Sequence, residues 1–188
     1  MTDEELLKEI QAGSEAALDV LIRRYYNEVY AYIVRRTRQE HLAYDLTQEV
    51  FTKMLHAIST LEMKKSLRGW LMTVALNHVR DYYRSKQAKT IHKERDLEEE
   101  IVKDSHPNVA YLFEKKETAR EVQEAVHTLP DYQSEAIVLK YFHEFKINEI
   151  AAMTDTTEST VKSRLRQGMK KLAKVLRKGD EENEQRRT

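Results

Sequence analysis

The sequence predicts an all-α protein of two small helical domains joined by a flexible linker, the second domain carrying a helix-turn-helix. Only four glycines and two prolines interrupt 188 residues, and alternating β-branched runs typical of strands are few. Apolar residues recur at helical spacing over residues 1 to about 87 and again over residues 116–178. Between these blocks, residues 88–115 lose the apolar pattern and include the charged run 93–100, which predicts a flexible acidic linker. The charged tail 179–188 lacks core residues, and we expect it to be disordered.

Composition excludes several classes of protein. The absence of cysteine rules out disulfides and cysteine-ligated metals. No apolar run approaches the length that crosses a bilayer, and the acidic N-terminus is unlike a signal peptide, so we expect a cytoplasmic protein. The formal net charge is zero, but the charge is segregated along the chain, so any contact with DNA should be local and helped by another protein.

The first block predicts four helices. Thr2 can cap a helix that runs to about Ala12, and a second helix begins at Ser14 after a glycine break. A third helix covers roughly residues 42–58, and a loop over residues 59–65 precedes a fourth that starts near Ser66. The third helix is expected to face inward with its apolar residues, Leu46, Val50, Phe51, Met54 and Leu55.

The fourth helix combines an apolar face with a basic flank. Residues 64–89 contain seven Lys or Arg against one acid, with aromatic residues among them. Basic and aromatic residues together are typical of sites that bind single-stranded nucleic acid, although Tyr82 and Tyr83 are expected in the core or at its rim. The core face should hold Leu67, Trp70, Leu71, Val74 and His78. The polar flank should hold Thr73, Asn77, Arg80 and Arg84.

The strongest functional pattern lies near the C-terminus, where a short helix from Ile147 leads into polar residues and then a second helix. This layout predicts a helix-turn-helix, whose second helix enters the DNA major groove. Residues 162–178 carry eight Lys or Arg and no acid, as expected of a surface that faces phosphates. The predicted core stripe of the second helix is Val161, Leu165, Met169, Leu172 and Leu176. The opposite face is Ser159, Ser163, Arg166, Gln167, Lys170 and Lys174, flanked by Lys162 and Arg164.

Two other functions remain as alternatives. A stand-alone transcriptional regulator could use the same helix-turn-helix, but the first block lacks the strands of a receiver domain. A metal-dependent enzyme could use His41 and Asp45, which are four residues apart, but no convincing third ligand accompanies them. The sequence has no phosphate-binding glycine loop or nucleophile elbow, so we expect neither catalysis nor a cofactor or metal.

Several separated segments resemble bacterial sigma factors of the extracytoplasmic-function type, the minimal two-domain class. Residues 45–51 (DLTQEVF) resemble D-L-x-Q-E-x-F, and residues 69–84 contain W-L followed by A-x-N-x-x-x-D-x-x-R. Residues 129–133 (LPDYQ) resemble the L-P segment before the second domain's long helix, and residues 160–165 read T-V-K-S-R-L. The segments occur in the family's order and spacing over about residues 5–176.

The resemblance implies a protein that binds core RNA polymerase, directs it to promoters and starts transcription, in an envelope or stress response. It implies an anti-sigma partner, which in this family is often linked to the membrane. Residues implied to bind core polymerase are Asp45, Gln48 and Glu49. Residues implied to handle the single-stranded −10 element are Lys64, Lys65, Trp70, Asn77, Arg80 and Arg84. Residues implied to read the −35 duplex are Ser159, Thr160, Lys162, Ser163, Arg164, Arg166, Gln167 and Lys170.

One segment departs from the family pattern. The turn of the helix-turn-helix usually contains glycine followed by an apolar residue, whereas Asp155 and Thr156 stand there in this chain. Aspartate adopts the left-handed conformation at modest cost, so we expect the turn to form with looser packing.

Overall fold

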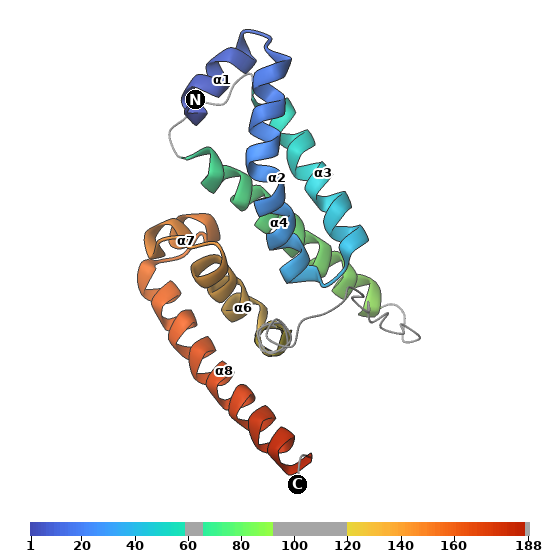
Figure 1. The fold of residues 1–188 in the computed structure, drawn as a ribbon, viewed down its shortest axis with the longest axis vertical. Helices are drawn as coiled ribbons and strands as arrows, with labels where there is room; N and C mark the ends of the chain where they lie inside the picture. Colours follow the sequence, from blue (N-terminus) through green and yellow to red (C-terminus); the bar gives the residue numbers. More distant parts are fainter. Residues whose placement is uncertain (59–65, 92–119, 187–188) are drawn as a thin grey trace.

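The computed structural model describes residues 1–58, 66–91 and 120–186, and within these ranges every regular element is a helix (Figure 1). The first domain consists of α1 (Asp3–Gln11), α2 (Glu15–Thr37), α3 (Glu40–Ala57) and α4 (Leu67–Ile91). The second contains helical residues 120–127. It continues with α6 (Asp131–Ile137), the π-helical turn η1 (Val138–Phe142), α7 (Ile147–Thr154) and α8 (Glu158–Arg186). The predicted all-helical fold is confirmed.

Local hydrogen bonds explain where the first helices begin. The Thr2 hydroxyl accepts from the Glu5 backbone N–H at 3.2 Å, and the Glu5 carboxylate accepts from the Thr2 N–H at 2.7 Å. This reciprocal capping box satisfies two donors that a helix start leaves unpaired. Ser14 caps α2 through a single such bond, because its hydroxyl accepts from the Ala17 N–H at 3.3 Å. The predicted cap at Thr2 and the predicted start of a helix at Ser14 are confirmed.

In the first domain α2 packs against α1, α3 and α4. The largest fully buried side chains there include Leu21, Tyr32, Met54 and Leu71. The prediction for Leu55 was wrong, because its side chain is 43% exposed. It follows the buried Met54 by one residue, and a rotation of about 100° carries it past the stripe that faces α2 and α4.

In the second domain α8 packs on α6 and α7. The predicted core positions Val161, Leu165 and Leu172 are buried, but Met169 is 44% exposed and its placement in the core was wrong. The neighbouring Gly168 is buried instead. A Cβ atom on this glycine would lie 2.6 Å from Cδ1 of Ile137, so α8 approaches α6 through the residue that lacks a side chain.

The C-terminal end also differs from expectation. α8 continues to Arg186, whereas the sequence predicted a disordered tail from Gly179. Most of the predicted linker, residues 92–115, and the loop 59–65 lie outside the described residues. No helix in the described part of the chain combines the length and apolar character needed to cross a membrane.

The two domains lie against each other rather than apart (Figure 1). α7 contacts α4, and η1 contacts α2. The sequence predicted a tether but gave no sign of this contact. The contact between the domains includes polar side chains of α2 and α4, which bond to side chains of α6.

Candidate nucleic-acid and protein interfaces

The turn of the helix-turn-helix forms around Asp155, which adopts the left-handed conformation with φ 51° and ψ 51°. The Thr156 backbone N–H donates to the Ala151 carbonyl at 3.0 Å. The Thr154 and Thr156 hydroxyls are 2.9 Å apart and share a hydrogen bond. Aspartate therefore serves in place of glycine as expected, and a hydrogen bond occupies the position where an apolar contact is usual.

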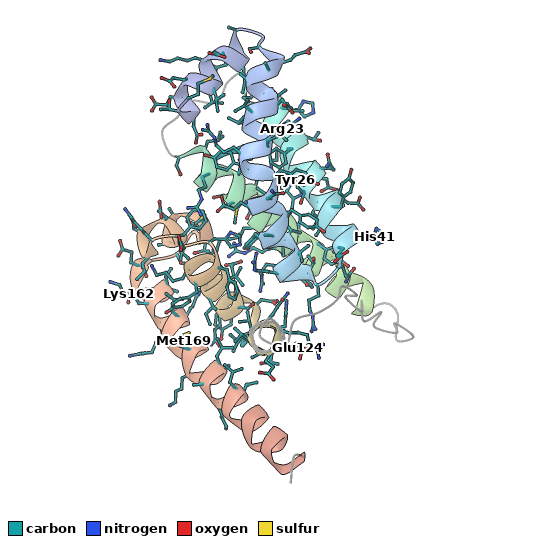
Figure 2. The ribbon with its side chains drawn as sticks, viewed as in Figure 1. Arg23, Tyr26, His41, Glu124, Lys162 and Met169 are labelled. Atoms are coloured by element: carbon teal, nitrogen blue, oxygen red, sulfur yellow. The ribbon has the colours of Figure 1, made fainter. Side chains whose placement is uncertain are left out.

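α8 presents most of the predicted reading residues to solvent. Thr157 caps the helix by accepting from the Thr160 N–H at 3.1 Å, which fixes the first turn of the helix. The exposed residues of the predicted set are Ser159, Lys162, Arg166, Gln167 and Lys170 (Lys162 is labelled in Figure 2). The half-buried ones are Thr160, Ser163 and Arg164.

Residues of α6 contact two residues of the predicted reading face, Gln167 and Arg164. Gln133, which is only 1% exposed, donates its amide to Gln167 Oε1 at 3.1 Å. Gln167 in turn donates to Ser163 Oγ at 3.2 Å, and the Arg164 guanidinium lies 5.6 Å from the ring centre of Tyr132. These contacts orient part of the reading face before any ligand binds. Sequence reasoning missed Gln133, because it lies 34 residues from its partner.

The basic flank of α4 is only partly free. Asn77 and Arg84 are exposed, and Arg84 lies 3.3 Å from Asp81. Trp70 is half-buried and packs against the hydrophobic core. Arg80 instead donates two hydrogen bonds to Glu135 of α6, at 2.9 and 2.6 Å. Lys64 and Lys65 lie outside the described residues.

The predicted acidic edge of α3 is on the surface. Asp45, Gln48 and Glu49 are all exposed, while Leu46 and Val50 between them are buried. Glu49 lies 3.0 Å from Nδ1 of His78 on α4. An open groove of about 380 Å³ follows this edge, lined by Gln48, Glu49, Thr52, Lys53, His56 and His78. His78 therefore bridges α3 and α4 at the edge of the core, where its Nε2 is buried without a hydrogen-bond partner among the described residues.

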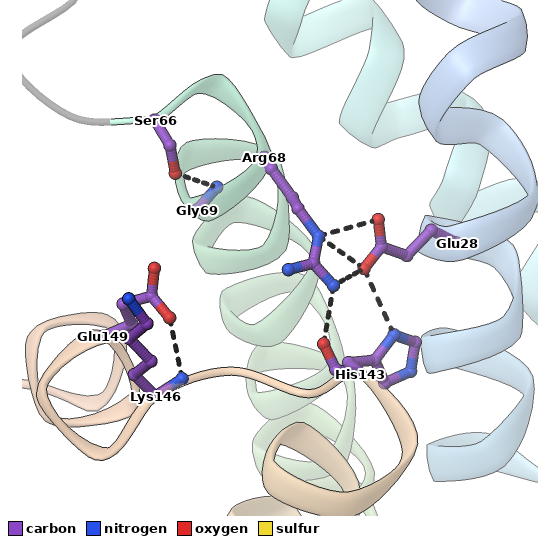
Figure 3. Close-up of polar contacts among 7 residues, drawn as sticks. All are labelled: Glu28, Ser66, Arg68, Gly69, His143, Lys146 and Glu149. Carbon is purple, nitrogen blue, oxygen red and sulfur yellow. Dashed lines mark hydrogen bonds and ion pairs between the residues drawn. The ribbon is translucent and has the colours of Figure 1, made fainter.

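A polar cluster away from these surfaces joins three segments that are far apart in the sequence (Figure 3). Arg68 of α4 pairs with Glu28 of α2 and donates to the His143 carbonyl at 2.6 Å. Its guanidinium also lies 4.1 Å from the ring centre of Phe145. Burial acts to raise the pKa of Glu28, but hydrogen bonds from His143 and Arg68 outweigh it and lower the pKa to about 2. The cluster is a charged pair with an interdomain contact, and sequence reasoning missed it.

Nothing in the described ranges resembles a metal centre, because no three His, Asp or Glu side chains come together there. His41 and Asp45 are both exposed on α3. Within the described residues, the predicted polar surfaces are the basic flank of α4, the acidic edge of α3 and the predicted reading face of α8.

Comparison with known families identifies a family region in each of the two domains. Sigma-70 region 2 matches residues 21–89, and sigma-70 region 4 matches residues 119–172. The chain is 26% identical to the RNA polymerase sigma factor YlaC of Bacillus subtilis (strain 168), over 88% of this chain and 95% of the relative. It is 29% identical to the ECF RNA polymerase sigma factor SigM of the same organism, over 86% of this chain and 96% of the relative.

Solved structures give the same fold. The sigma factor RpoE in complex with the anti-sigma factor NepR from Bartonella quintana matches with a TM-score of 0.71 at 20% identity, covering 85% of this chain and 96% of that one. CnrH in complex with the cytosolic domain of CnrY matches with a TM-score of 0.69 at 22% identity, covering 93% and 96%. At these identities the likeness concerns the fold alone.

Proposed function

Because the chain belongs to the sigma-70 family of RNA polymerase sigma factors, in its extracytoplasmic-function group, we propose that it binds core RNA polymerase and directs it to specific promoters. The observation that carries this proposal is the presence of both family regions in order, on two helical domains. The second of these domains exposes a basic helix after a well-formed turn. As a family member the chain is a transcription initiation factor, and we propose no catalytic activity for it.

The second domain is proposed to read the −35 duplex with α8. Ser, Arg and Gln side chains can hydrogen-bond base edges, and Lys side chains suit phosphates. The residues proposed for this face are Ser159, Thr160, Lys162, Ser163, Arg164, Arg166, Gln167 and Lys170. The cap at Thr157 and the contact with Gln133 support the role, because they orient the face in advance.

The first domain is proposed to handle the −10 strand and to dock on polymerase. Asn77, Arg80 and Arg84 lie on one flank of α4, and Lys64, Lys65 and Trp70 are proposed to extend that site. Asp45, Gln48 and Glu49 are proposed to bind polymerase, because their side chains are exposed over a buried stripe that anchors α3. Their neighbouring groove gives a partner side chain space to enter.

The experiment that tests the proposal is a pull-down with core RNA polymerase followed by run-off transcription. Asp45→Lys with Glu49→Lys should abolish core binding, with little loss of stability beyond the contact of Glu49 with His78. Glu9→Lys with Asp19→Lys makes the same change of charge at exposed positions of α1 and α2 and should bind normally. Circular dichroism establishes that both variants remain helical.

Normal core affinity of the Asp45 and Glu49 variant at moderate salt would refute the docking role. Binding of DNA without any binding of core polymerase would instead favour a stand-alone regulator. An anti-sigma factor is a further proposed partner, since the matched RpoE structure contains one. Co-purification of the chain with a single stoichiometric protein that blocks its core binding would support that partner.

A further inference from the structure

Arg80 is engaged with a residue of the other domain. It donates through Nε and one terminal nitrogen to the two carboxylate oxygens of Glu135. The Glu135 side chain is only 4% exposed, whereas that of Arg80 is 36% exposed. A two-pronged guanidinium–carboxylate contact has the same geometry as a guanidinium–phosphate contact. Glu135 therefore occupies the part of Arg80 that a phosphate would bind.

A second arginine of the first domain is covered by the same helix. Arg36, near the end of α2, donates to the hydroxyl of Ser134, and its other terminal nitrogen lies 3.7 Å from the Asp131 carboxylate. Ser134 and Glu135 are consecutive on α6, and the charges of Arg36 and Arg80 both act on the buried phenol of Tyr32, so the two guanidinium groups lie in the same part of the interface. Arg36 is 6% exposed, and within the described structure its Nε is buried without a hydrogen-bond partner. α6 thus covers this arginine without satisfying all its donors.

The closed arrangement cannot bind a whole promoter. The −10 and −35 elements are centred roughly 25 base pairs apart by their names, which at about 3.4 Å per base pair is on the order of 85 Å of duplex. A compact chain of this length has a radius of gyration of only about 16 Å. Since Glu135 lies on the helix that packs under α8, its bond to Arg80 holds the reading face close to α4. Binding both elements requires that bond to break.

We propose that Arg36 and Arg80 form one binding site for phosphates of the −10 strand, which α6 occupies in the free chain through Ser134 and Glu135. Free chain and promoter-bound chain then use the same two arginines for different partners. The identity of the ligand, a single-stranded DNA backbone, rests on the proposed function. The new element is Arg36, which we add to the residues proposed to contact that strand. Exchange is feasible because a carboxylate–guanidinium pair roughly breaks even against its desolvation cost, so the closed form is not strongly favoured.

The first test measures closure in the free, full-length chain. The sequence contains no cysteine, so Glu40→Cys and Lys171→Cys, both at exposed positions, introduce one dye site in each domain. We expect Glu135→Lys to lower energy transfer, and the charge swap Arg80→Glu with Glu135→Lys to restore it. Unchanged transfer in Glu135→Lys, or no recovery in the charge swap, would overturn the closed contact.

The second test measures the phosphate site, again in the full chain, by anisotropy of a fluorescent single-stranded DNA 12-mer of mixed sequence at low salt. Glu135→Gln should bind at least fivefold more tightly than wild type. Glu124→Gln removes the same charge from an exposed position of the same domain and should change affinity less than twofold. When combined with Glu135→Gln, Arg80→Gln and Arg36→Gln should each remove the gain in DNA affinity. The charge-swap variant should keep the two domains in contact but should not bind the DNA.

Equal affinities of Glu135→Gln and Glu124→Gln would refute the competition, and full affinity of the Arg80 variant would refute the site. Because Arg36 is buried, its variant is used only if its circular dichroism matches that of wild type. If it does not, the affinity of Arg80→Gln is the deciding measurement. Core polymerase binding is measured separately. A chain that opens and binds DNA as described but fails to bind polymerase would contradict the proposed function and leave the site standing.

Discussion

At the scale of single residues, Gly168 decides how closely α8 can approach α6. An added Cβ would lie 2.6 Å from Cδ1 of Ile137, a side chain that is 2% exposed and has little room to move. Alanine in the middle of a helix is favoured over glycine by about 1 kcal/mol, but overpacking a core costs about 1–3 kcal/mol. The steric cost should therefore exceed the gain in helix propensity.

We predict that Gly168→Ala lowers the free energy of unfolding by about 1 kcal/mol, measured by urea denaturation. In an Ile137→Val background, which lacks Cδ1, the same substitution should be neutral or stabilising. An equal effect in both backgrounds would show that the contact with Ile137 is not the cause.

At the scale of elements, we expect α8 to contact base edges near its start and phosphates further along. Near its start, Gln167 and Arg164 are held by residues of α6, whereas Arg166 is exposed. Two turns further on, Lys174 is also exposed, beyond the residues that lie closest to the turn. Recognition helices contact base edges with their N-terminal residues, so the later lysine is expected to reach phosphates.

We predict that Arg166→Ala changes the preferred −35 sequence at one base pair, at a cost of about 1–3 kcal/mol for the preferred base. Lys174→Ala should weaken binding to all −35 sequences alike. It should also reduce the salt dependence of binding by about the amount expected for one phosphate contact. Transcription from a library of randomised −35 elements measures both. An unaltered preference for the Arg166 variant, or an altered one for the Lys174 variant, would mean that the reading face is assigned wrongly.

At the scale of the whole molecule, one titratable side chain of the second domain, His127, lies near arginines of the first. His127 is half-buried, and its Nε2 has no hydrogen-bond partner in the part of the chain that the structure describes. Burial, and then the positive charges of Arg38 and Arg36, lower the pKa of His127 to about 4 from 6.5. Between those values the unfolded chain binds a proton that the folded chain does not. Acid therefore removes stability as the pH falls from 6.5 to 4.

We predict that His127→Gln makes the chain less sensitive to acid over this range. Between pH 7 and pH 4 the variant should lose less unfolding free energy than wild type, by on the order of 1–2 kcal/mol. This figure allows for solvent screening of a side chain that is not fully buried. Urea denaturation at several pH values measures this difference between the two proteins. The contributions of their shared acidic residues cancel when one profile is subtracted from the other. Parallel pH profiles for the two chains would contradict the prediction.

The sequence by itself determined the helices, the turn and most of the exposed positions on the polar face of α8. Thr2, Ser14 and Asp155 act on backbone groups within a few residues of themselves, so their effect is legible in the local sequence. The buried positions of α3 and α8 followed mostly from helical periodicity, since one face of each helix must leave water. The family resemblance rests on the same local segments.

Only the tertiary structure decided the exceptions. Met169 and Leu55 are exposed because the partner helix sets which part of an apolar stripe is covered, and Gly168 shows how close that partner comes. Arg80 and Glu135 are 55 residues apart, and each alone resembles an ordinary charged residue on a helix surface. Their pairing depends on how two domains pack together, and periodicity within a single helix carries no information about which distant charge it will meet.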